Sequence, residues 1–257
     1  MNSDLEAVVH LFSGSARGWR GTARTKPASK VPEKMLKLYD LDVSPFCRLV
    51  REVLCEMDLD VLILPCPKGG TRFRPEAKTL LDNATFPLLV DENTGVVMKE
   101  SADIIDYLGK TYGSKARAAR GAKRPLQVGS SMLASIMQLR SKGLAGMKAS
   151  ASKAPKQPLE LFAFETSPYS KPVRARLCEL ELPYVLKNCP KGAKTDMGPP
   201  MFRDKLFKGP MGTTRNRKWL AENTGKVQVP YLVDPNTGQA MYESQKILRY
   251  LNETYGA

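Results

Sequence analysis

The residues best suited to chemistry in this sequence are two serines, each followed by a proline. Ser44 opens the stretch SPFCR, and Ser167 opens the stretch SPYSK 123 residues later. A hydroxyl at the start of a helix can donate a hydrogen bond to an anionic sulfur, and the helix dipole adds to that stabilisation. Each serine could therefore stabilise a thiolate, or it could simply cap a helix, as serine often does.

A cysteine three residues after the first serine raises the question of thiol chemistry. Dithiol enzymes exchange disulfides through a C-x-x-C pair. This chain has Ser44 and Cys47 at those places in the first copy, and Ser167 and Ser170 in the second. Dithiol exchange is therefore not expected. Cys47 could form a mixed disulfide if its thiol is exposed, but an inert, half-buried thiol is the favoured interpretation.

Both serines lie in a repeat that covers most of the chain. The stretch LKLYDL at 36–41 corresponds to LELFAF at 159–164, again 123 residues apart. Further on, FPLLVDENTG and VPYLVDPNTG correspond at an offset of 143, as do ESADIIDYL and ESQKILRYL. Ordered similarities of this kind indicate a duplication. The difference between the offsets predicts a 20-residue insertion in the second copy, within 194–228.

Each copy predicts the same order of elements. An alternating strand precedes the serine, a helix follows it, and a second strand ends at Cys-Pro-Lys-Gly. An irregular or helical stretch then leads to a hairpin around Asn-Thr-Gly and to a closing helix that ends on glycine. The order β-α-β-(α)-β-β-α predicts an α/β sandwich in each copy.

Charge divides the chain into four segments, and the net charge of +14 is unevenly spread among them. The connector has ten Lys and Arg and no Asp or Glu, so it carries +10, whereas module 1 carries −4. The leader carries +3 and module 2 carries +5. A basic tether of this kind attracts anionic surfaces, or it is simply a solvated linker. The four segments are the leader (1–35), module 1 (36–113), the connector (114–158) and module 2 (159–257).

The order of motifs resembles the N-terminal domain of glutathione transferases, which has the thioredoxin fold shared with glutaredoxins. The S-P-F form is most similar to the plant-type serine classes. The resemblance implies two thioredoxin-like modules in tandem, with glutathione as co-substrate or ligand and Ser44 and Ser167 as the thiolate-stabilising residues. It also implies that Pro87 and Pro230 follow cis peptide bonds. The preceding residues, Phe86 and Val229, would then pair with the glutathione backbone.

The same resemblance gives a role to the Glu-Ser pair that opens the closing helix of each copy. Glu100 and Glu243 would hold the ammonium group of the γ-glutamyl moiety. Ser101, Ser244 and the helix amides would hold its carboxylate. The alternative is capping of the closing helix, and the two roles are compatible. No metal site is expected, because the chain has one histidine, and that residue lies outside both modules.

Two classes of function follow from these motifs. The first is a glutathione-binding, transferase-like or thiol-handling protein. The alternative is a non-catalytic scaffold, because only about 45 residues follow module 1 and none follow module 2, whereas transferases append a helical domain that holds the second substrate. Nucleic-acid binding by the connector is not expected, since no aromatic residue interleaves its charges.

Short amphipathic patterns in the leader and connector suggest further partners. Apolar residues recur at helical spacing in both segments, and each such helix could pack on a module or lie on an anionic membrane surface. An acidic protein is another possible partner of the connector. No transmembrane span or disulfide framework is expected. The predicted compartment is intracellular and reducing, with the chloroplast favoured by the leader composition and the cytoplasm as the alternative. The residues of the helical patterns are Leu5, Val8, Val9, Phe12, Leu133, Ile136, Met137, Leu144 and Met147.

Overall fold

The computed structural model of the protein describes residues 19–113, 128–132, 145–196 and 212–257. Both modules have the predicted element order, which is thereby confirmed. Module 1 comprises β1 (Lys37–Asp40), α2 (Pro45–Glu56), β2 (Val61–Pro65), α3 (Phe73–Leu80), β3 (Leu88–Asp91), β4 (Val96–Lys99) and α4 (Ser101–Thr111). Module 2 comprises β5 (Leu159–Ala163), α6 (Ser170–Glu179), β6 (Tyr184–Asn188), the 3-10 turn η1 (Lys194–Asp196), α8 (Arg215–Thr224), β7 (Tyr231–Asp234), β8 (Gln239–Tyr242) and α9 (Ser244–Tyr255).

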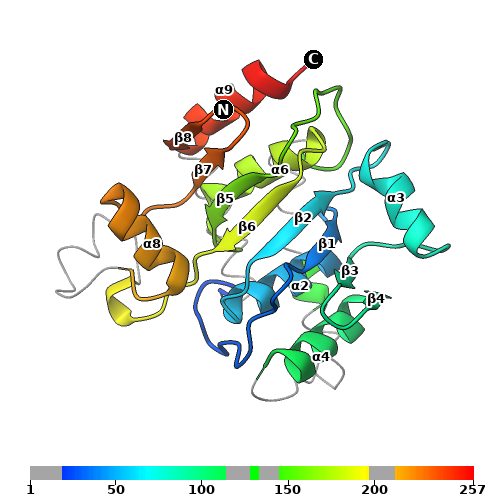
Figure 1. The fold of residues 1–257 in the computed structure, drawn as a ribbon, viewed down its shortest axis with the longest axis horizontal. Coiled ribbons are helices and arrows are strands. Elements are labelled where there is room, and N and C mark those ends of the chain that lie inside the picture. Colours follow the sequence, from blue (N-terminus) through cyan, green and yellow to red (C-terminus); the bar gives the residue numbers. More distant parts are fainter. Residues whose placement is uncertain (1–18, 114–127, 133–144, 197–211) are drawn as a thin grey trace.

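The strands of both modules form one continuous sheet in the order β4-β3-β1-β2-β6-β5-β7-β8 (Figure 1). The modules join through β2 and β6, which pair antiparallel with Val61 opposite Leu186 and Ile63 opposite Tyr184. Within each module the first two strands run parallel, and the hairpin is antiparallel to them. The two modules are therefore related by an approximate two-fold axis between β2 and β6. Each covers the edge strand of the other.

Alternating residues of the strands separate two faces of this sheet. Leu38 and Leu161 point into one large core that also contains residues of α2, α4, α6 and α9. Tyr39 packs with α3, and Phe162 packs with α8, in two smaller clusters. One face of the sheet is thus covered by four helices shared between the modules. The other face carries α3 and α8, one in each module.

The segment that precedes each module pairs with the other module. In the leader, Arg24 donates its backbone N–H to the carbonyl of Lys191 in module 2 (2.9 Å), and Lys191 donates to that of Thr22 (2.8 Å). In the connector, Ala149 donates to the carbonyl of Lys68 in module 1 (3.0 Å), and Lys68 donates to that of Met147 (2.6 Å). Lys68 and Lys191 occupy equivalent places in the repeat, so the crossing obeys the same two-fold relation.

Charged side chains lie buried between α2 and α6, where the two modules meet. Arg51 donates to both carboxylate oxygens of Asp40 (2.6 and 2.7 Å) and to Glu165 (3.0 Å). Its repeat equivalent, Arg174, contacts Glu165 (3.1 Å) and Asp42 (3.2 Å). All five side chains are at most 7% exposed. Buried charges require such partners, so these groups tie the modules together.

A third arginine, Arg48, extends this cluster, and its guanidinium forms no hydrogen bond within the described part of the chain. Its side chain is 2% exposed, and its guanidinium nitrogens lie 3.7 Å from Glu52 and 3.9 Å from Glu165 at closest. Lys171, its repeat equivalent, is also buried, and burial followed by the charge of Arg48 lowers the pKa of its ammonium group well below the usual value.

Several sequence expectations fall at the borders of the described ranges. Lys191 and Arg215 correspond to Lys68 and Arg72, so the 20-residue insertion lies between β6 and α8, mostly outside the described residues. The helical pattern of the leader lies outside them too, as do Leu133 to Leu144 of the connector. Met147 was expected in a helix but lies in a turn, because its carbonyl accepts from Lys68. Within the described ranges, the helices are too short or too polar to cross a bilayer.

Candidate functional site

Three predicted motifs of module 1 meet at one end of the sheet. Tyr39, Leu88 and Lys99 are cross-strand neighbours on β1, β3 and β4. Ser44 follows β1, the Phe86–Pro87 pair precedes β3, and Glu100 follows β4. The register therefore brings these three loops side by side. In module 2 the neighbours Phe162, Tyr231 and Tyr242 place Ser167, Val229–Pro230 and Glu243 in the same way.

Ser44 is the N-cap of α2, the first helix of module 1. It has an extended backbone (φ −65°, ψ 126°), and its hydroxyl oxygen accepts the backbone N–H of Cys47 at 3.4 Å. Pro45 then begins α2, where its missing N–H costs nothing. The Ser44 side chain is half-buried, and the neighbouring Phe46 is 38% exposed. The turn that carries Ser44 is therefore partly open to solvent.

Cys47 is not placed as an exposed nucleophile. The side chain is fully buried, and its sulfur accepts the backbone N–H of Leu41 at 3.4 Å. Burial, then the nearby carboxylate of Asp40, raise the pKa of the Cys47 thiol well above its usual value. Since only the thiolate is reactive, this thiol is inert in the folded chain. The other cysteines, Cys55, Cys66, Cys178 and Cys189, are buried too.

Both predicted X-Pro bonds, Phe86–Pro87 and Val229–Pro230, are cis, as expected. Pro87 and Pro230 are buried, whereas Phe86 and Val229 are half-buried. The guanidinium of Arg74 lies 4.9 Å from the centre of the Phe86 ring and covers it on the α3 side.

The Glu-Ser pairs lie where the closing helices begin, in an uncommon backbone conformation. Glu100 has φ 71° and Glu243 has φ 73°, in the left-handed region that non-glycine residues seldom adopt. Neither residue caps its helix with a side-chain hydrogen bond. Ser101 is 2% exposed, and its hydroxyl has no hydrogen-bond partner among the residues that the structure describes. A buried polar group without a partner is costly, and repeated backbone strain is common at binding sites.

Ser167, the equivalent of Ser44 in module 2, is not accessible to a ligand. Ser167 is 1% exposed, and its oxygen accepts both the backbone N–H of Ser170 (3.2 Å) and the Ser170 hydroxyl (2.8 Å). The preceding residue, Thr166, shares a hydrogen bond with the hydroxyl of Thr22 in the leader. Ser244 is half-buried, unlike Ser101. The two copies therefore share a backbone arrangement but differ at the hydroxyl that would meet a thiolate.

One contact near Ser44 was not predicted from the sequence. Ser131, in a helical turn of the connector at 128–132, is fully buried and donates to the carbonyl of Pro45 at 2.8 Å. Val128 of the same turn packs against the main core. The connector thus supports the turn that carries Ser44. Its Gly, Ser and Lys composition gave no local signal for this contact.

A comparison with models of protein families identifies the family of this chain. The family model described as "Glutathione S-transferase, N-terminal domain" matches residues 38–116 and 161–257. A comparison with curated protein sequences gave no significant match. Among solved structures, the chain is similar to Leishmania TDR1, described as a unique trimeric glutathione transferase, with 16% identity, a TM-score of 0.30, and coverage of 87% of this chain and 68% of that one. Because the family model matches more than half of the sequence, the chain belongs to the glutathione S-transferase N-terminal domain family and contains that domain twice.

Proposed function

We propose that the chain binds glutathione at the module 1 site formed by Ser44, Phe86–Pro87 and Glu100–Ser101. The observation that carries this proposal is the buried Ser101 hydroxyl, which has no partner and lies at the start of α4 beside the other two loops. A ligand carboxylate would accept from that hydroxyl and from the first amides of α4, where the helix dipole favours an anion.

Each remaining part of the ligand has a suitable group in the proposed site. The exposed carboxylate of Glu100 would pair with the γ-glutamyl ammonium. The backbone of Phe86 would pair with the cysteinyl peptide group. The Ser44 hydroxyl would donate to the thiolate, which the N-terminus of α2 also stabilises. The protein would thereby hold the sulfur in its reactive, deprotonated form.

Module 1 is the preferred site because its serine is accessible. The Ser167 hydroxyl oxygen already accepts two hydrogen bonds from Ser170, and its side chain is buried. A ligand sulfur would have to displace the Ser170 contacts before it reached Ser167. This difference favours one glutathione per chain, with module 2 as a supporting scaffold.

A glutathione-binding site is not by itself a transferase. The thiolate accelerates conjugation only if an electrophile is held beside it in the attacking geometry. The exposed side chains of Phe46 and Met132 lie next to Ser44 and to the buried Ser131, and they would contact such a molecule first. Conjugation at module 1 is therefore the activity to assay once binding is established.

The test is calorimetric titration of glutathione into the whole chain and into matched variants. Ser101→Ala and Glu100→Ala should abolish the binding heat, whereas Ser244→Ala and Glu243→Ala should leave it unchanged. Because the Ser101 hydroxyl has no partner, its removal should not destabilise the fold. The expected stoichiometry is one. Absence of heat and of any thermal shift at about 10 mM glutathione would overturn the proposal, since saturating ligand must stabilise the folded state.

A further inference from the structure

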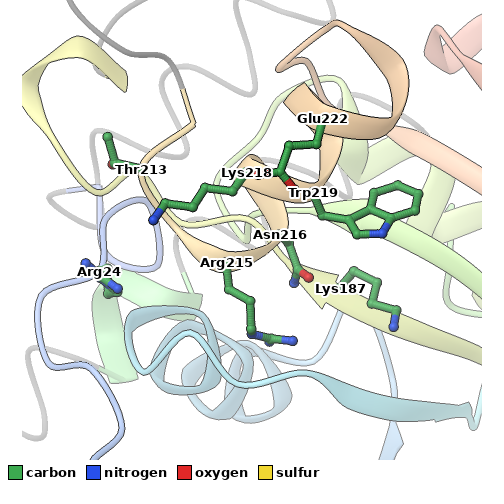
Figure 2. A pocket seen from close by; sticks show the side chains of 8 residues that line it. All are labelled: Arg24, Lys187, Thr213, Arg215, Asn216, Lys218, Trp219 and Glu222. Atoms are coloured by element: carbon green, nitrogen blue, oxygen red, sulfur yellow. The ribbon is translucent and has the colours of Figure 1, made fainter.

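An open pocket of about 620 Å³ lies at the start of α8, and none of its lining residues belongs to a Ser-Pro motif. Its walls come from three segments: the leader, β6 and α8 (Figure 2). Lys187 alternates with the core residue Leu186 along β6, so it points to the face of the sheet that carries α8. The side chains used below are Arg24, Lys187, Arg215, Lys218, Trp219 and Glu222.

The pocket contains a half-exposed tryptophan on a rigid support. Trp219 is 39% exposed and stacks on Phe162, with ring centres 4.8 Å apart and an angle of 18° between the planes. Phe162 in turn packs against Tyr231 (5.7 Å), which packs against Tyr242 (4.4 Å). An indole that is already oriented and still partly exposed offers a surface on which a further planar ring can stack at little entropic cost.

Cationic groups surround this ring. Asp60 accepts from two nitrogens of Arg215 (2.8 and 2.9 Å), and Arg24 lies 3.8 Å from Asp58, so both arginines already have acidic partners. Lys187 contacts the half-exposed Glu160 at 3.3 Å.

Lys218 is exposed and forms no ion pair with any residue in the described ranges. In Figure 2 Lys187 lies on the Trp219 side of the pocket, and Lys218 points toward the opposite side. The two ammonium groups therefore flank the pocket, and Glu222 is the one acid that lines it among the described residues.

The same place in module 1 is closed by different residues. Trp219 corresponds to Glu76 and Lys187 to Leu64 in the repeat. Glu76 accepts the hydroxyl of Tyr39 at 2.6 Å, and Leu64 is buried. The pocket is therefore a feature of module 2 and does not follow from the fold. Six of its eight lining residues belong to the segment 194–228, which has eight Lys and Arg against three Asp and Glu.

We propose that this pocket binds a nucleotide, with its base stacked on Trp219 and its phosphates held by Lys187 and Lys218. Lysine binds phosphate as a mobile point charge, and a pocket of this volume suits a ligand of nucleotide size. Arg24 and Arg215 also line the pocket, but their charges are compensated by Asp58 and Asp60, which leaves the two lysines to bind phosphate. Binding here is independent of the glutathione site, since the two sites share no residue.

The test uses Trp219 as its own reporter. The chain has two tryptophans, so Trp19→Phe leaves Trp219 as the sole source of tryptophan emission. Titration of this variant with ADP should quench that emission in a saturable way. Adenosine and pyrophosphate should each bind more weakly than ADP. Lys187→Ala and Lys218→Ala should each weaken ADP binding at least about tenfold, the effect of losing one charged hydrogen bond.

The control variant is Lys246→Ala, which removes an exposed lysine from α9 on the other face of the sheet. It should bind ADP as the parent does. The proposal is overturned if ADP causes no saturable change, or if Lys246→Ala weakens binding as much as the pocket variants. It is also overturned if pyrophosphate matches ADP, because the ring is then not recognised. It is likewise overturned if a single-stranded oligonucleotide binds much more tightly than ADP, because the site is then part of an extended nucleic-acid-binding surface.

Discussion

Arg51 of α2 and Glu165, which follows β5, form an ion pair across the junction of the two modules, with 3.0 Å between Nε and Oε2. Both side chains are at most 2% exposed. Glu165 also contacts Arg174, its neighbour on α6, so one carboxylate of module 2 holds an arginine from each module. The modules therefore depend on each other for charge compensation in their shared interior.

We predict that Arg51→Met destabilises the whole chain. The substitution leaves Asp40 and Glu165 without one guanidinium, and breaking a buried ion pair typically costs about 3–5 kcal/mol. Urea unfolding should show this loss in a single transition for both modules. Lys37→Met is the control, because its pair with Glu92 is exposed and should change stability by about 0.5 kcal/mol or less. Equal stability of the two variants would contradict the prediction.

Stability should fall in acid partly through Glu165. Burial alone would raise the pKa of this carboxyl, but Arg174, Arg51 and Arg48 outweigh it and lower the pKa to about 2. A depressed folded pKa contributes stability above the unfolded value of about 4.3, and that stability is lost as the pH falls toward 2. The difference in unfolding free energy between the parent and Glu165→Gln should shrink over this range. A constant difference from pH 7 to 2 would be inconsistent with this role.

The packing of the leader against module 2 should be destabilised by a methyl group at Gly21. Gly21 has φ +75°, and an added Cβ would lie 2.8 Å from Cβ of Glu165. Gly95 has a similar φ of +70° but open space around it. Gly95→Ala should cost about 1–2 kcal/mol from the left-handed backbone. Gly21→Ala should cost about 1–3 kcal/mol more through overpacking, measured by thermal unfolding. Equal losses would mean that the leader is not held as described.

The native chain should be unreactive toward thiol reagents. All five cysteines are buried, and burial raises the pKa of Cys47, Cys55 and Cys66 well above the usual value. A water-soluble aromatic disulfide should therefore modify no thiol in the folded protein, and all five after unfolding. Rapid release of one equivalent from the native chain would instead identify an accessible cysteine.

The repeat predicted each module well because its signals are local. Ser-Pro, X-Pro and Glu-Ser each occur at element boundaries, where residue type and backbone conformation are closely linked. The element order followed from them, whereas the two cis bonds were expected from the family resemblance that these motifs carry. The inaccessibility of Ser167 did not follow from either, because it depends on the rotamer of Ser170 and on Thr22, a residue about 145 positions away in the sequence.

The contacts between the two modules could not be predicted from the sequence, for a different reason. Leu49, Val53 and Leu54 recur at helical spacing and pack in the core, so the same spacing would assign Arg48 and Arg51 to a polar side of α2. Both arginines are nevertheless buried, because a second module covers that side. Likewise, an edge strand such as β2 carries no local mark of its partner, since backbone hydrogen bonds do not depend on side-chain identity.

The pairing of β2 with β6 has a consequence for how the chain emerges from the ribosome. Ile63 pairs with Tyr184, which is synthesised about 120 residues later. At about 5–20 residues per second, synthesis of the intervening segment takes roughly 6–24 s. Throughout that interval the nascent first half presents an open strand edge beside uncompensated arginines. Two incomplete chains on neighbouring ribosomes of one mRNA can then pair with each other through β2. Slow translation between the repeats should therefore increase aggregation, and a chaperone that shields strand edges should matter most in this interval.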